Sequence, residues 1–117
     1  MKKIFNAFLY SMNGLRILLK ERAFLQELLL LPVVVCVVYL CHSPCMKAYI
    51  AFSYVLVLIT EALNTAIEKT VNRISTEIHQ LSKEIKDISS AAVFIALTNF
   101  VIGCLIGLTT LYSVFSL

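Results

Sequence analysis

Three long apolar runs alternate with polar segments along the chain. Residues 28–46 contain no charged side chain unless His42 is protonated, and residues 88–117 contain none at all. Residues 47–72 begin apolar and become polar toward their end. A helix needs about 20 apolar residues to cross a hydrocarbon core about 30 Å thick. The pattern therefore predicts three membrane-spanning helices, at 28–46, 47–72 and 88–117.

Two segments mix charged and apolar side chains. In residues 1–27, polar residues interrupt the apolar positions and no signal-peptide cleavage pattern follows, so we expect an amphipathic helix in the membrane interface. Residues 73–87 are strongly polar and lack glycine and proline. They are expected to form a cytoplasmic segment that extends the preceding helix, turns near residues 79–82 and begins the next helix.

Composition narrows the class of protein further. Hydrophobic residues make up 60% of the chain and the mean hydropathy is +0.89, against about 45–50% apolar residues in a soluble domain. The apolar runs do not alternate with polar positions as the strands of a membrane barrel do. The glycines lie only at positions 14, 103 and 107, which excludes a glycine-rich phosphate loop. We therefore expect one all-α membrane domain over residues 1–117.

The basic residues are unevenly distributed. Five lie in the N-terminal segment and four within residues 69–86, whereas Lys47 stands alone between the first two spans. Loops rich in lysine and arginine remain in the cytoplasm, so the N-terminus and residues 73–87 are expected there and the C-terminus outside. The net charge of +3 is interpreted as a determinant of topology and anionic-lipid contact, with no nucleic acid partner.

The four cysteines show no metal-binding spacing. Cys36, Cys41 and Cys45 lie in or beside the first apolar run, and Cys104 lies in the third. No CxxC motif is present. The pattern favours free, buried thiols, and a Cys41–Cys45 disulfide at the outer face stays an open alternative.

One polar row marks the second span. Glu61, Asn64 and Glu68 are spaced by three and seven residues, which returns a helix to nearly the same side. A carboxylate near a bilayer centre costs about 3 kcal/mol and by default indicates a functional site. A helix end emerging into water would explain Glu68. It explains Glu61 less well, because residues 48–60 carry no charge.

Further acids and lysines gather near the predicted cytoplasmic interface. Magnesium prefers oxygen ligands and is often held by one or two carboxylates together with substrate phosphates. These side chains could therefore hold a metal–nucleotide complex, or they could simply form a solvated charged loop. The set comprises Glu21, Glu61, Glu68, Glu77, Glu84 and Asp87, accompanied by His79, Lys83 and Lys86.

The run EALNTAIEKTVNRISTEIHQLSKEIKDISSAAV, residues 61–93, resembles the signature of the small prokaryotic diacylglycerol kinase family. The shared elements are E-x-L-N-[ST]-A-I-E, then a glutamate and a histidine two positions apart, then K-D before the last span. NGLR at 13–16 and ERAFLQE at 21–27 match the upstream part of the family more loosely, because the family's usual spacing between that glycine and the first acid is one residue longer.

This resemblance implies a homotrimer of three-span subunits, each with an amphipathic N-terminal helix, in the bacterial cytoplasmic (inner) membrane. Such enzymes transfer the γ-phosphate of magnesium-ATP to the hydroxyl of diacylglycerol and yield phosphatidic acid for phospholipid metabolism. Their active site lies at the membrane surface and is shared between subunits.

The resemblance also implies roles for individual residues. Glu61 would be the general base, and it is the deepest acid of the polar row. Lys3 stands where the family often has arginine, and Asn72 where some relatives have aspartate. The other implied roles are metal ligands for Glu21 and Glu68, which also contact the nucleotide; nucleotide binding for Tyr10, Glu77, His79, Lys86 and Asp87; and lipid-substrate binding for Lys3, Asn64 and Ser90.

Two other functions stay open. An undecaprenol kinase belongs to the same family, but that branch more often has a proline after the histidine and glycine-rich residues after K-D. A small non-enzymatic membrane protein could use Glu61 for proton coupling, which would leave Glu77, His79, Lys86 and Asp87 without a purpose.

Overall fold

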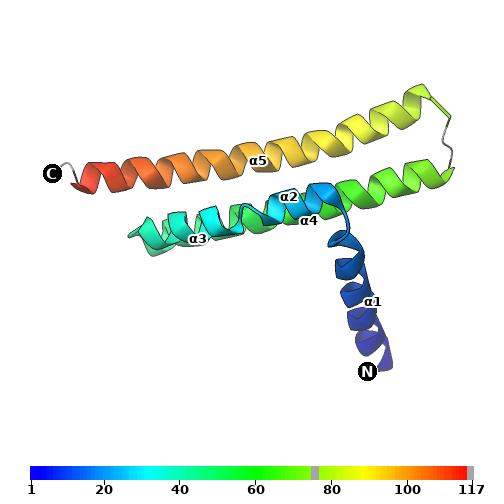
Figure 1. Ribbon diagram of the computed structural model, residues 1–117, viewed down its shortest axis with the longest axis horizontal. Helices are drawn as coiled ribbons and strands as arrows, with labels where there is room; N and C mark the ends of the chain where they lie inside the picture. Colours follow the sequence, from blue (N-terminus) through cyan, green and yellow to red (C-terminus); the bar gives the residue numbers. More distant parts are fainter. Residues whose placement is uncertain (75–76, 116–117) are drawn as a thin grey trace.

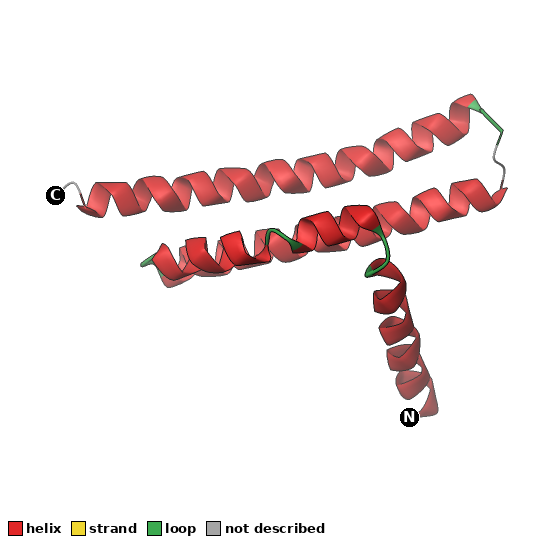
Figure 2. Cartoon of the chain, viewed as in Figure 1, coloured by secondary structure: helices red, strands yellow, loops and turns green. Residues whose placement is uncertain are grey.

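The computed structural model describes residues 1–74 and 77–115, and these residues form helices without any strand (Figures 1 and 2). The all-α prediction is therefore confirmed. The elements are α1 (Lys2–Leu18), α2 (Arg22–Leu28), α3 (Leu31–Leu40), α4 (Pro44–Ile74) and α5 (Gln80–Phe115).

The helices form a hairpin with a two-part helix packed against it. Helices α4 and α5 run antiparallel along most of their length, and α2 and α3 follow each other along the same bundle (Figure 1). Helix α1 projects steeply away from this bundle: its C-terminal end lies beside α4, and its N-terminal end is far from the bundle (Figure 1). None of its residues is buried, so most of its apolar side chains are exposed in the single chain.

Three helical stretches are long and apolar enough to cross a membrane, namely Arg22–Leu40, Pro44–Ile74 and Gln80–Ser113. This confirms three candidate membrane-spanning helices, with bounds that differ from the expected ones. The first stretch begins at Arg22, because a short connection at residues 19–21 ends α1 earlier than the charge pattern indicated.

Pro32 divides the first stretch into α2 and α3. Proline has no N–H, and its ring clashes with the carbonyl four residues earlier. Accordingly, the Leu30 N–H bonds to the Glu27 carbonyl in a tighter turn, and α3 begins at Leu31 with Pro32 in its first turn. The physical result is a break in the helix just before the proline.

Most of the expected polar segment at 73–87 is helical. Helix α4 continues to Ile74 and α5 already begins at Gln80, so residues 80–82 belong to a helix and not to the expected turn. The ring Nδ1 of His79 accepts the Leu81 N–H at 3.1 Å. This satisfies one of the N–H groups that a helix start leaves without a partner, which explains why α5 begins there.

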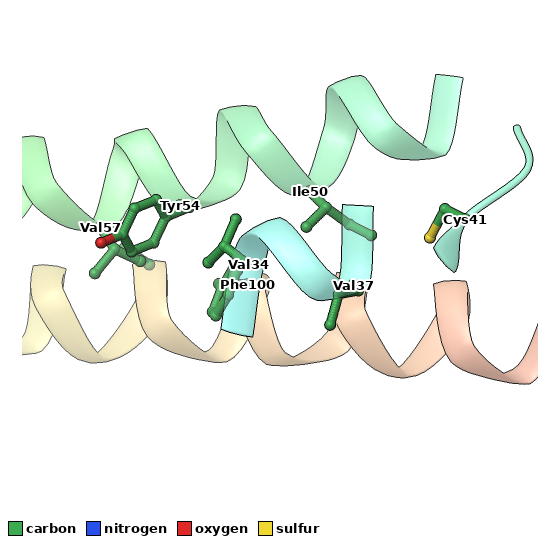
Figure 3. Packing of buried hydrophobic residues seen from close by; sticks show 8 residues of the cluster. Val34, Val37, Cys41, Ile50, Tyr54, Val57 and Phe100 are labelled. Carbon is green, nitrogen blue, oxygen red and sulfur yellow. The ribbon is translucent and has the colours of Figure 1, made fainter. Parts of the chain in front are cut away.

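The apolar core lies where α3, α4 and α5 meet (Figure 3). Ile50 and Val57 of α4 are fully buried, and the rings of Tyr54 and Phe100 lie 5.9 Å apart. All four cysteines are free thiols, so Cys41 and Cys45 do not pair. The core thus fixes the position of α4 relative to α5, the two helices that carry most of the polar side chains discussed below.

The glycines of α5 permit close approach of its neighbours. A Cβ atom on Gly103 would lie 2.6 Å from Cε1 of Tyr49, and one on Gly107 would lie 2.9 Å from Sγ of Cys41. The GxxxG spacing therefore serves helix packing within the chain, as small residues do in membrane bundles.

Candidate active site

The polar row of α4 begins in the interior of the bundle, at Glu61, and ends in water, at Glu68. Glu61 is 4% exposed and Asn64 9% exposed. Glu68, two turns further along, is exposed. The expected gradient, with Glu61 deepest and Glu68 nearest water, is present within the single chain.

Asn64 connects the row to α5. Its side-chain oxygen accepts the Ser89 hydroxyl at 2.7 Å, and its amide nitrogen lies 3.4 Å from Oε1 of Glu68. Thr65 is also buried, and its hydroxyl donates to the Glu61 backbone carbonyl at 3.0 Å. These bonds hold the side chains of the row in fixed positions relative to α5.

Glu27 of α2 is a site residue that the sequence interpretation missed. Its carboxyl group lies near enough to that of Glu61 to interact with it electrostatically. Its Oε2 atom is buried and has no hydrogen-bond partner among the described residues. The Tyr54 hydroxyl donates to the Glu27 backbone carbonyl at 2.9 Å. The sequence signal was an acid placed directly before an uninterrupted apolar run.

Glu21 approaches α4 from the connection between α1 and α2. Its Oε1 lies 2.8 Å from Nζ of Lys69, which directly follows Glu68. The expected metal ligands Glu21 and Glu68 therefore belong to one region of the molecule. Lys69 was not among the expected site residues.

Four expected nucleotide-binding residues line one surface hollow of about 290 Å³. Lys83 also borders it and forms an ion pair with Asp87 at 3.0 Å. The Lys86 ammonium donates to the Asn72 side-chain oxygen at 2.8 Å and thereby links the hollow to α4. We call this feature the 77–87 hollow; it is lined by Glu77, Ile78, His79, Ser82, Lys83, Lys86 and Asp87.

Three of the expected site residues remain apart from the others. Tyr10 and Lys3 are exposed on α1, which points away from the bundle. Ser90 is exposed, whereas its neighbour Ser89 is the buried serine that bonds to Asn64. The sequence did not reveal which of the two adjacent serines faces α4, because that depends on the rotation of α5.

The carboxylates suit a metal that arrives with a phosphate ligand. Over residues 1–74 and 77–115, no three His, Cys, Asp or Glu side chains are grouped to hold a metal by themselves. Two carboxylates are nevertheless available in one region. Glu21 already attracts a cationic group, the Lys69 ammonium, and Glu68 directly precedes Lys69 in the sequence. One or two carboxylates plus substrate phosphates are a common arrangement for magnesium, so this donor set fits it.

The fold and these groups define a small helical membrane protein with an acidic site near the connection of its two longest helices. The prokaryotic diacylglycerol kinase family matches residues 9–108 of this sequence. The chain belongs to that family and is a multi-pass bacterial membrane protein.

Curated members of this family align with this chain over most of their length. The diacylglycerol kinase of Pseudomonas aeruginosa is 45% identical over 100 residues, which cover 84% of this chain and 81% of the relative. The Escherichia coli K12 diacylglycerol kinase is 42% identical over 104 residues, 86% of this chain and 84% of its own. The Haemophilus influenzae diacylglycerol kinase is 36% identical over 107 residues, 90% and 86% of the two chains.

Proposed function

We propose that this protein is an ATP-dependent diacylglycerol kinase that produces phosphatidic acid. The observation that carries the proposal is the continuity of the polar row with the 77–87 hollow. Asn64 bonds to Ser89 on α5, and Asn72 bonds to Lys86 on the same helix. A lipid hydroxyl at the buried end and a nucleotide at the exposed end would thus be held on one pair of helices.

Glu61 acts as the general base in this scheme. It accepts the proton of the lipid hydroxyl while the hydroxyl oxygen forms a bond to the γ-phosphorus and the bond from that phosphorus to the bridging oxygen of ADP breaks. Burial shields the Glu61 carboxylate from water, and the side chains of Asn64 and Glu27 lie close to it. Asn64 is proposed to orient the lipid hydroxyl, and Ser90, on the exposed side of α5, is proposed to contact the lipid substrate.

The exposed end supplies charge for the nucleotide. Phosphoryl transfer depends mainly on positioning and on electrostatic stabilisation of the transferred group. Lys86 offers an ammonium to the phosphates, and Glu77, His79 and Asp87 offer polar groups to the rest of the nucleotide. Magnesium, held by Glu21 and Glu68, would neutralise the phosphate oxygens.

We further propose a homotrimer in the bacterial inner membrane, with the N-terminus in the cytoplasm. No residue of α1 is buried within the chain, so its apolar side chains are free to pack on a second subunit or to contact lipid. Helix α1, which carries Tyr10 and Lys3, points away from the bundle, so we propose that these two residues complete the site of a neighbouring subunit. The basic residues of the N-terminal segment support the orientation.

Purified protein in mixed micelles tests this proposal directly. Labelled ATP and magnesium are supplied with diacylglycerol in one sample and with undecaprenol in another, and labelled lipid is separated and counted. We expect phosphatidic acid as the main product. Preferential phosphorylation of undecaprenol would assign the chain to the other lipid kinase, and no transfer to either lipid would support a non-enzymatic membrane protein.

A further inference from the structure

Lys69 is a cationic side chain that contacts one of the two proposed metal ligands, Glu21. It follows Glu68 in the sequence, and its ammonium lies 2.8 Å from the Glu21 carboxylate. The two side chains are 58% and 33% exposed. The pair therefore lies at a water-accessible edge of the site, where a cation from solution can reach it.

The Glu21 carboxylate is directed at Lys69 of α4 and not at the first turn of α2. Glu21 occupies the N-cap position of α2, yet its side chain makes no capping hydrogen bond. Lys69 in turn lines the groove of about 440 Å³ between α1 and α4, together with Gly14, Leu18 and Thr65. The ion pair thus ties the connection between α1 and α2 to α4 at the mouth of this groove.

We infer that the Lys69 ammonium occupies the position of a divalent cation at Glu21, and that the cation must displace Lys69 in order to bind. This inference rests on the proposed role of Glu21 as a metal ligand. It assigns Lys69 a positioning role: without metal, Lys69 keeps the Glu21 carboxylate against α4, one residue from Glu68.

The chemistry of the pair favours such an exchange. An ammonium is a compact charge on a flexible four-carbon chain, so it can withdraw without movement of the helix. A half-exposed ion pair contributes little net stability, and a divalent cation interacts more strongly with the same carboxylate because it carries twice the charge. Lys69 therefore raises the metal concentration that the site requires without blocking the site.

Titration with Mn²⁺, followed by electron paramagnetic resonance, tests this inference without relying on turnover. Mn²⁺ binding is measured for the intact protein in detergent and for Lys69→Met, Lys69→Arg and Glu21→Gln. Lys69→Met should bind Mn²⁺ about two- to fivefold more tightly, the size expected for freeing one carboxylate from an exposed ion pair. Lys69→Arg should resemble the unmodified protein, and Glu21→Gln should bind more weakly.

Kinetics provide the second measurement. At saturating ATP, the free Mg²⁺ concentration for half-maximal rate should fall by the same factor in Lys69→Met, with little change in the maximal rate. Arg73→Met is the matched control, because it removes a positive charge one turn further along α4; its Mn²⁺ affinity should change less than about twofold. The double variant Lys69→Met/Glu21→Gln should bind Mn²⁺ no better than Glu21→Gln alone.

Unchanged or weaker Mn²⁺ binding by Lys69→Met overturns the inference. It is also overturned if none of these proteins binds Mn²⁺ at concentrations that support catalysis. Unchanged binding by Glu21→Gln also overturns it. A failure of the proposed function is distinct, because it appears as missing phosphate transfer to diacylglycerol whatever the Mn²⁺ affinities are.

Discussion

The Ser89 hydroxyl lies 2.7 Å from the side-chain oxygen of Asn64 and 3.0 Å from the backbone carbonyl of Lys86. It is buried between α4 and α5. Through this one hydroxyl, the helix that carries Lys86 and Asp87 is connected to the residue between Glu61 and Glu68. The positions of the lipid end and the nucleotide end of the site therefore depend on each other.

Replacing Ser89 with alanine should lower turnover. The substitution leaves the buried Asn64 oxygen without its donor, and an unsatisfied buried acceptor costs about 1–3 kcal/mol. We expect turnover with diacylglycerol to fall about tenfold, the equivalent of about 1.4 kcal/mol in the barrier. Steady-state kinetics measure this effect. Ser90→Ala should instead raise the diacylglycerol KM, and identical effects of the two substitutions would contradict the distinction between the serines.

Glu61→Gln and Glu68→Gln should affect different kinetic parameters. Glutamine retains the shape of Glu61 but cannot accept a proton, so turnover should fall by about two to four orders of magnitude with little change in ATP affinity. Glu68→Gln should weaken binding of the metal–nucleotide complex as well. The measurements are turnover at saturating ATP and ATP binding by calorimetry. Normal saturated turnover in Glu61→Gln would show that the base lies elsewhere.

Alanine substitutions of the glycines should separate packing positions from open ones. A methyl group at Gly103 or Gly107 would overlap with Tyr49 or Cys41, and overpacking typically costs about 1–3 kcal/mol. At Gly14 no described atom other than those of its chain neighbours and its own helix backbone lies within 4 Å of the added Cβ, and alanine favours the helix by about 0.5–1 kcal/mol. Thermal unfolding in detergent, followed by circular dichroism, should show lower stability for the first two variants only.

The proposed assembly predicts a trimer in mild detergent. The apolar side chains of α1 are largely uncovered within one chain, and packing on a second subunit would cover them. Light scattering coupled to size-exclusion chromatography measures the mass of the protein without its detergent. A monomer with full kinase activity would contradict the shared site.

Subunit mixing gives a sharper test of the same idea. One variant carries Glu61→Gln, and the other carries alanine at both Lys3 and Tyr10. If one subunit's α1 completes the site of another, the mixed assembly should recover part of the activity that each variant has lost. No recovery in assemblies shown to be mixed would place α1 at its own chain's site.

The helical period accounts for what the sequence could predict of the site. The spacing of Glu61, Asn64 and Glu68 placed them on one side of α4, and their change from buried to exposed followed from the charges along the chain. The grouping of Glu77, His79, Lys86 and Asp87 also followed from their closeness in sequence. Interactions within one helix or its immediate continuation leave a periodic signal that a single sequence carries.

Contacts between separate helices leave no such signal. The approach of Glu27 to Glu61 and of Glu21 to Lys69 depends on how α2 packs along α4. The choice of Ser89 over Ser90 depends on the rotation of α5 in its contact with α4. The end of α1 at Leu18 was likewise hidden, because neither glycine nor proline occurs in residues 15–27 to mark it.

The break before Pro32 gives the first membrane-spanning stretch a joint. On the C-terminal side of the joint, α3 is fixed in the core through Val34 and Val37. On its N-terminal side, α2 is a seven-residue arm that follows directly on Glu21 and carries Glu27. The Tyr54 hydroxyl donates a hydrogen bond to the Glu27 carbonyl, near the joint. Because the helix is interrupted at this joint, the direction of the arm is set by its own contacts with α4, among them the buried Phe24 and the Tyr54 hydroxyl, and not by a continuous helix through the core. The placement of both acids is thereby separated from the packing deeper in the membrane.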